Sequence, residues 1–156
     1  VSQGSVEFPR GLPRMPSQLQ SPEVQAFATG FPVTLLHASV TLVMLILGTA
    51  LYALMTPHKE ITLIREGNSA AALSLGGVMV GLAIPLSVSL KASTSVIEIA
   101  IWGAATIAVQ LLVFRVTDMI LKGLPERIQD GEISAAALLV GAKLATALIL
   151  AAAVAG

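Results

Sequence analysis

Four long apolar runs dominate the chain, and the polar positions between them are confined to short connections. The runs cover approximately residues 33–55, 70–90, 96–114 and 134–154. Each is close to the ~20 residues that an α-helix needs to cross ~30 Å of hydrocarbon. Helices also satisfy their own backbone hydrogen bonds, which is required of any segment that spans lipid. The pattern therefore predicts an all-α membrane protein with four transmembrane helices.

Residues 1–32 differ from the rest of the chain. They hold Pro9, Pro13, Pro16, Pro22 and Pro32, with Gln, Ser and Gly between them. This composition predicts an irregular N-terminal tail, followed by a four-span domain over residues 33–156. The first apolar run begins only at Val33 and is too long for the core of a signal peptide, so we expect no signal peptide.

The basic residues predict the orientation. Most of them lie in the two longer connections, after the first and the third run: Lys59, Arg65, Arg115, Lys122 and Arg127. Only Lys91, with the more distant Arg10 and Arg14, belongs to the other side. Because cytoplasmic loops carry the excess of Lys and Arg, both longer connections are predicted in the cytoplasm and both termini outside it.

A short sequence occurs twice. Ser69–Leu73 reads Ser-Ala-Ala-Ala-Leu, and Ser134–Leu138 reads the same. Each copy opens an even-numbered span shortly after a glycine, Gly67 or Gly131. We therefore predict two tandem helical hairpins, residues 33–90 and 96–156, which form a parallel internal repeat about an axis along the membrane normal.

Small residues line one side of each even-numbered span. On the second span they are Gly76, Gly77 and Gly81, and on the fourth they are Ala137, Gly141 and Ala145. Small side chains let helix backbones approach closely in lipid, where apolarity alone drives no association. We interpret both stripes as helix-packing surfaces rather than as ligand sites.

The stretch Arg65–Ala72, followed by these glycines, resembles the signature of the YjfL-like inner-membrane proteins. That family is built on a duplicated two-span domain of unknown function. The resemblance covers about residues 33–156, and the second copy departs from it, with Glu132 and Ile133 where the first copy has Asn68. It implies a bacterial inner-membrane location and brings no known activity or catalytic residue.

Lys143 is the most informative single residue. It lies about 13 Å into the fourth span, near the midplane, where a charged side chain is costly and normally faces a bundle, a cavity or a partner. It points away from the small stripe of its own helix. Gln110 has a matching depth on the third span, so we expect a hydrogen bond between the two side chains. This pair is either structural or a polar step on an ion or proton route; snorkelling of Lys143 to a headgroup is the remaining alternative.

The connections hold one further candidate. Asn68 suits the N-cap of the second span, and it could instead order the cytoplasmic connection. The acidic residues of the connections alternate with basic ones and are expected to form a solvated face: Glu60, Glu66, Glu126, Asp130 and Glu132.

Composition excludes several function classes. The formal net charge is zero, which disfavours nucleic-acid binding. With no cysteine and two histidines we expect no metal or other cofactor, and the sequence motifs of common enzymes are missing, so we expect no enzyme. The predicted partners are the lipid bilayer and either a second copy or another membrane protein. The preferred function is a small oligomerising accessory or scaffold subunit. The alternative is a subunit of a small ion or solute channel or transporter, with Lys143 and Gln110 at the midplane.

Overall fold

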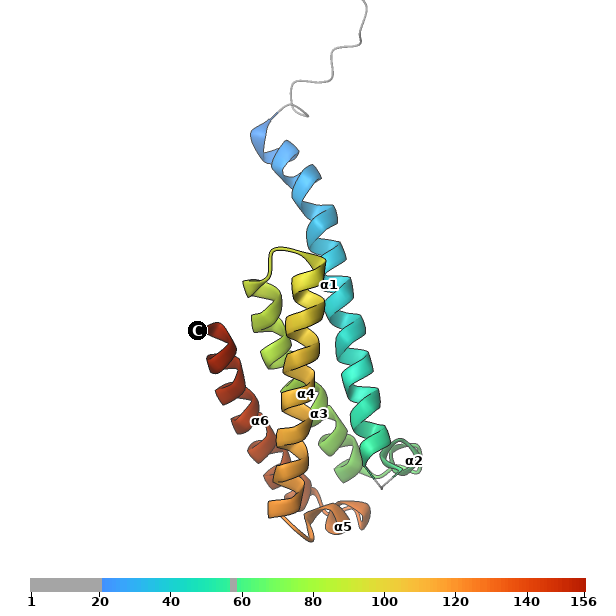
Figure 1. The fold of residues 1–156 in the computed structure, drawn as a ribbon. Coiled ribbons are helices and arrows are strands. Elements are labelled where there is room, and N and C mark those ends of the chain that lie inside the picture. Colours follow the sequence, from blue (N-terminus) through green and yellow to red (C-terminus); the bar gives the residue numbers. More distant parts are fainter. Residues whose placement is uncertain (1–20, 57–58) are drawn as a thin grey trace, which may run out of the picture. The chain divides into compact units, whose positions relative to one another are not determined.

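The computed structural model describes residues 21–56 and 59–156, and the described chain folds into helices throughout (Figure 1). The helices are α1 (Pro22–Met55), α2 (Glu60–Arg65), α3 (Ser69–Ala92), α4 (Val96–Ile120), α5 (Leu124–Gln129) and α6 (Ile133–Ala155). Within this described part, the four helices α1, α3, α4 and α6 are long and apolar enough to cross a membrane. The predicted all-α fold with four membrane-spanning helices is confirmed at this level.

The start of α1 corrects the predicted tail. We expected an irregular segment up to residue 32, but the helix begins at Pro22. Proline suits the first helical position, where its missing N–H is not needed, and the Ser21 hydroxyl accepts a hydrogen bond from the Val24 N–H at 3.4 Å. Pro32 removes one backbone hydrogen bond from α1 without ending it. Residues 1–20 of the predicted tail lie outside the described residues.

The chain divides into two compact units, and residues 21–35 belong to the first. Within this unit Phe27 and Phe31 stack one helical turn apart, with 5.1 Å between their ring centroids. The second unit, residues 36–156, contains the rest of α1, all the other helices and every residue of the site described below.

In residues 36–156, α3 is the central helix. It packs against α6, α4, α2 and α5. The short helices α2 and α5 lie at the same end of this unit (Figure 1), which we call the short-helix end.

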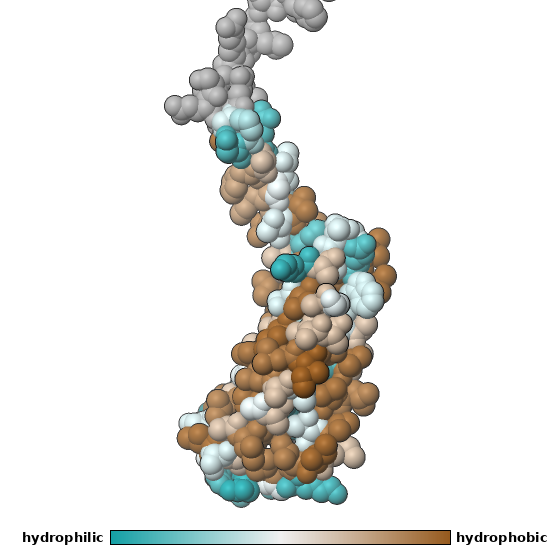
Figure 2. All heavy atoms as spheres, turned by 90° about the vertical axis from the view of Figure 1, so that its left-hand side faces the viewer, coloured by the Kyte–Doolittle hydropathy of each residue, from teal (hydrophilic) through white to brown (hydrophobic). Residues whose placement is uncertain are grey.

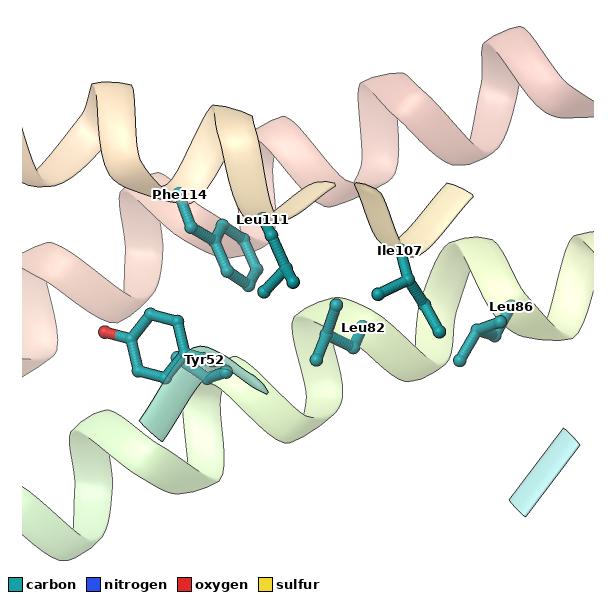
Figure 3. Close-up of a cluster of buried hydrophobic side chains, with 7 residues drawn as sticks. Tyr52, Leu82, Leu86, Ile107, Leu111 and Phe114 are labelled. Carbon is teal, nitrogen blue, oxygen red and sulfur yellow. The ribbon is translucent and has the colours of Figure 1, made fainter. Parts of the chain in front are cut away.

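The main apolar core lies between α1, α3 and α4 (Figure 3). Its buried members are Tyr52, Val78, Leu82, Leu86, Ile107, Leu111 and Phe114. Glycine allows the helices to approach here, because a Cβ on Gly81 would lie 2.7 Å from Cζ of Phe114. A side chain at this position would force the Phe114 ring out of the core.

A second core joins α3 to α6 near the short-helix end. It holds the alanine pairs Ala70–Ala71 and Ala135–Ala136, with Leu139 and residues of α5. A Cβ on Gly77 would lie 2.5 Å from Cγ2 of Val140, so α3 and α6 are in backbone-to-side-chain contact there. Gly77 and Gly81 thus both lie against a neighbouring helix.

The other predicted packing residues face outward. A Cβ added to Gly76 or to Gly141 would have no neighbouring heavy atom within 4 Å in the described chain. Ala137 and Ala145 are exposed. Within this chain α6 therefore packs through the opposite face from the one we expected, and that inward face carries Lys143. Burying the lysine against protein turns the small stripe of α6 outward.

Both short helices end in the same way. Gly67 and Gly131 adopt φ angles of +90° and +85°, which favour glycine. After α2, the Asn68 N–H donates to the Leu63 carbonyl; after α5, the Glu132 N–H donates to the Arg127 carbonyl. These bonds complete Schellman-type C-caps. Asn68 and Glu132 are then the N-cap residues of α3 and α6.

The outer surface of residues 36–156 is apolar along the long helices. On the face shown in Figure 2 brown spheres cover the long helices, and teal spheres gather at the short-helix end. Ile46, Leu112 and Ile149 remain 66%, 65% and 71% exposed. An apolar surface of this extent is typical of contact with lipid rather than with water.

Candidate functional site

Lys143 is completely buried inside the bundle. Its Nζ donates a hydrogen bond to the Tyr52 hydroxyl at 2.6 Å and lies 2.9 Å from Oδ1 of Asp118. The Asp118 contact is an ion pair by distance, although its angles are not those of a hydrogen bond. Side chains of a helix lean toward its N-terminus, so the lysine extends from the middle of α6 toward the short-helix end. Its charge is compensated within the chain, and no headgroup is needed for this.

The expected hydrogen bond between Gln110 and Lys143 is wrong. Gln110 is fully buried, but neither Oε1 nor Nε2 has a hydrogen-bond partner among the described residues. The expectation compared the depths of the two Cα positions. The lysine side chain carries its charge about 6 Å from the backbone, toward Asp118, which lies two turns beyond Gln110 on α4. A carboxylate also compensates the ammonium charge, which an amide cannot do.

Two aromatic rings cover the lysine. Tyr52 and Phe114 meet edge to face, with centroids 6.2 Å apart, and Figure 3 shows the Tyr52 hydroxyl pointing away from the leucines of the core. The ammonium of Lys143 lies 5.4 Å from the Phe114 centroid. On α4, Phe114 sits one turn from Asp118 on one side and from Gln110 on the other. Phe114 therefore lies between Asp118 and Gln110 along α4.

Glu60 corrects the expectation of a solvated acidic face. It is the first residue of α2 and is only 6% exposed. Ser74 donates a hydrogen bond to Oε1 at 3.3 Å, whereas Oε2 has no partner in the described chain. Burial raises the pKa of Glu60, and the charge of Lys143 and the Ser74 hydrogen bond oppose this shift. Six residues are too few to show which face of a helix is buried, so the sequence alone did not identify Glu60.

A cavity of about 190 Å³ joins these groups. Tyr52, Glu60, Ser74 and Asp118 line it, and all six helices contribute to its wall. Its rim at the short-helix end carries exposed residues, among them Arg115, Glu126 and Gln129. The space suffices for several water molecules, and the wall offers the polar partners that they need. The side chains of Glu60 and Asp118 thus line a space that water can occupy.

Asn68 both caps α3 and holds the connection after α5. Its Oδ1 accepts from the Ala71 N–H at 2.9 Å. Its Nδ2 donates to the carbonyls of Ile128 and Gln129 at 3.0 and 2.9 Å. These carbonyls belong to the last turn of α5, and that of Ile128 also accepts from the Gly131 N–H at 3.0 Å. Asn68 therefore ties the first short connection to the second, and the two roles expected for it from the sequence coexist.

The opposite half of the bundle holds one buried polar pair. Ser89 of α3 and Thr106 of α4 are hydrogen-bonded to each other at 3.1 Å. Thr106 lies one turn from Gln110. Among the described residues there is no group of three or more His, Cys, Asp or Glu side chains placed to hold a metal ion.

Comparison with known proteins adds the family. The sequence profile of the Domain of Unknown Function DUF350 matches residues 26–154. The chain is similar to two curated proteins, both named UPF0719 inner membrane protein YjfL, from Escherichia coli (strain K12) and Escherichia coli O157:H7. Each is 35% identical over 85 residues, which cover 54% of this chain and 64% of the relative. The match thus spans less than two thirds of the relatives' length. No solved structure matches.

Proposed function

We propose an ion-pathway role for this chain, which belongs to the DUF350 family and is a multi-pass inner-membrane protein. In this proposal it is a subunit of a small channel or transporter, not an enzyme. The observation that carries the proposal is the Lys143–Asp118 ion pair, in which Asp118 lines the cavity. Ionisable groups inside a membrane bundle are costly and usually mark ion or substrate routes.

A buried ion pair that served only in packing would not need a cavity beside it. Asp118 keeps 15% of its side chain exposed, and it lines a space that leads to the rim. Beyond the Phe114 ring, Gln110 and the Ser89–Thr106 pair continue the polar positions toward the other end of the bundle. Phe114 is the apolar barrier of the route in this proposal.

The orientation and the repeat complete the proposed arrangement. We place the short-helix end in the cytoplasm and both termini outside, because the basic residues of the connections gather at this end. We also interpret residues 33–90 and 96–156 as tandem copies of one hairpin. The common length of α2 and α5 and the positive φ of Gly67 and Gly131 support this interpretation.

An oligomerising accessory or scaffold role is the second candidate. The outward-facing stripe on α6, made by Ala137, Gly141 and Ala145, supports it. Stripes of this kind pack helices in lipid. Association with a second copy would serve both candidates. Four spans enclose too little space for a wide pore, so a pathway would also gain from it.

The test compares ion flux in proteoliposomes for three proteins. They are the wild type, Lys143→Leu, and the double variant Lys143→Leu/Asp118→Leu. Replacing both partners by apolar residues of similar size is often neutral for stability, whereas removing one leaves a buried charge. Lys91→Leu is the matched control, because Lys91 is exposed at the other end of the bundle. The native mass of each protein in nanodiscs reports folding and association.

If the ion pair belongs to a pathway, the double variant keeps the wild-type mass and loses the flux. If the pair is only structural, the double variant keeps both. A wild type that moves no proton, sodium, potassium or chloride contradicts the pathway. A defined oligomer without flux would then support the accessory role.

A further inference from the structure

The charges around the cavity do not balance when every group is ionised. Lys143 carries one positive charge, and the carboxylates of Glu60, which is buried, and Asp118, which is partly buried, lie near it. The rim residues Arg115 and Glu126 carry one charge of each sign and offset each other. Among residues 21–56 and 59–156, the lysine lies in ion-pair contact with Asp118 alone. Glu60 therefore needs one further positive charge, or it must be neutral, because an uncompensated buried charge is strongly unfavourable.

The geometry of Glu60 leaves one oxygen for that purpose. Oε1 accepts from Ser74, and Oε2 has no partner among the described residues although the side chain lines the cavity. Glu60 as a residue is 6% exposed, and its side chain lines the cavity. Oε2 itself is buried, so a proton reaches it from the cavity through a small rearrangement of the side chains around Glu60.

The surroundings favour a proton over a metal ion. Two carboxylates, one of them already paired with a lysine, are a poor ligand set for a divalent ion, which prefers six or more oxygens. The nearby ammonium of Lys143 also repels a second cation. A proton adds the single missing charge and needs no coordination shell.

We infer that the proton is the ion taken up by this cavity and that the Glu60 carboxylate binds it. This inference rests on the proposed pathway and names its ion. The step is a simple acid–base exchange: a hydronium ion in the cavity gives its proton to a Glu60 oxygen, and a water molecule remains. Burial already raises the pKa of Glu60, which favours the protonated form.

Charged and titratable groups from the surrounding elements lie near this site, and Lys143 and Asp118 influence Glu60 electrostatically. These groups are Tyr52 from α1, Asp118 and Arg115 from α4, Glu126 from α5, Lys143 from α6, and Lys59 beside Glu60; α3 contributes the hydroxyl of Ser74. His58 is close in the sequence and lies outside the described residues, so the experiment includes a His58→Ala variant.

The experiment measures protonation of Glu60 with dicyclohexylcarbodiimide on the full chain in nanodiscs. This reagent reacts with a protonated carboxyl group in apolar surroundings: the proton moves to a carbodiimide nitrogen and the carboxylate adds to the central carbon. Mass spectrometry quantifies the label on each acidic residue from about pH 5 to about pH 9. Glu60→Gln is the negative variant. Glu126→Gln is the matched control, because Glu126 lines the same cavity at its exposed rim.

We expect Glu60 to be the main labelled residue, with labelling that falls about tenfold per pH unit above its pKa. This dependence should persist in Glu126→Gln and His58→Ala and disappear in Glu60→Gln. Labelling of Glu60 no greater than that of exposed carboxylates, or independent of pH, overturns the inference. Protection of Glu60 by sodium or potassium chloride, but not by choline chloride, overturns it in favour of a metal cation.

Flux separates the failure of the inference from that of the pathway. Proton flux in wild-type vesicles supports both if Glu60→Gln abolishes it and Glu66→Gln, at an exposed residue outside the cavity lining, leaves it unchanged. Sodium or potassium flux without proton flux overturns the inference and leaves the pathway standing. A protein that moves no ion contradicts the pathway and the proton as its cargo, whatever the labelling shows.

Discussion

The helix pairs α2–α3 and α5–α6 follow one backbone plan and differ in where they bury charge. Each begins with a six-residue helix, continues through a glycine with positive φ and enters a long helix. Glu60 and Leu124 each open the short helix, and both are buried. Counted from Ser69 and Ser134, Val78 and Lys143 occupy the same position, and both are fully buried.

The charge thus sits in the short helix of one pair and in the long helix of the other. Glu60 and Lys143 are close enough to influence each other electrostatically. Leu124 and Val78, at the corresponding positions of the other pair, carry no charge. The lesson is that a shared backbone plan does not make the site, which depends on side chains that differ between the two pairs.

The connections diverge in a similar way. Asn68 caps α3 through its side chain and also binds the last carbonyls of α5. Glu132 makes no side-chain cap for α6 and instead pairs with Arg127 at the surface. Only the first pair therefore contributes a side-chain link between the two connections.

The largest effect is expected when the second pair loses its buried charge. Lys143→Leu leaves the Asp118 carboxylate without its partner, which costs about 3–5 kcal/mol for a fully buried pair. We expect about 3 kcal/mol, because Asp118 retains 15% exposure and can be hydrated from the cavity. The double variant Lys143→Leu/Asp118→Leu should recover most of this loss. Titration with sodium dodecyl sulfate in mixed micelles measures the free energy of unfolding; equal losses for the single and double variants would refute the compensation.

Gly76 and Gly77 of α3 are neighbours in the sequence but differ in how closely other side chains pack against them. In Gly77→Ala the new methyl group would lie 2.5 and 2.6 Å from the two Cγ atoms of Val140, so no rotation of that valine removes the clash. We expect a loss of about 1–3 kcal/mol. Gly76→Ala is the control: its methyl group meets nothing within 4 Å, and alanine favours the helix by about 0.5–1 kcal/mol. The free energy of unfolding, measured by the same titration, should fall in Gly77→Ala and rise in Gly76→Ala. Adding Val140→Ala to Gly77→Ala should restore most of the loss.

Much of the fold could be predicted from the sequence because spanning a bilayer imposes length and apolarity. The spans themselves follow from this constraint, and Asn68 follows from the chemistry of helix caps. The start of α1 did not follow, because five prolines indicated an irregular segment, whereas Pro22 occupies the first helical position and α1 continues through Pro32.

The site was only half predictable for a different reason. The depth of Lys143 indicated a partner, but depth was compared at the backbone, and the long side chain moved its charge to Asp118. Glu60 gave no signal because α2 is too short to show periodicity. Nothing in the sequence pattern singled out Tyr52, whose hydroxyl accepts a hydrogen bond from Lys143.

The caps provide a smaller contrast between the two pairs. Asn68→Ala removes the acceptor for Ala71 and the donor to two carbonyls of α5, so we expect a loss of about 1–2 kcal/mol. Glu132→Ala removes only an exposed ion pair with Arg127, and no measurable change is expected. Hydrogen exchange adds a local readout: amides at the end of α5 should lose protection in Asn68→Ala alone. Equal effects of the two variants would contradict the difference in capping.

The two pairs should also respond to pH with opposite signs. The pKa of Glu60 is raised from its ordinary value of 4.5, chiefly by burial, so the folded protein binds more protons than the unfolded chain above pH 4.5. Stability from this group is present below pH 4.5 and is lost as the pH rises through the folded pKa. The pKa of Glu132 is lowered, chiefly by the Arg127 hydrogen bond, so its contribution is present above pH 4.5 and is lost as the pH falls below it. We expect the free energy of unfolding, measured above and below pH 4.5, to fall as the pH rises above 4.5. Glu60→Gln should remove this decrease. The rising slope at acidic pH, which Glu132→Gln removes, should be the smaller one because Glu132 and Arg127 are hydrated. A Glu60→Gln protein that keeps the slope above pH 4.5 would assign that titration to another group and leave the two pairs alike in this respect.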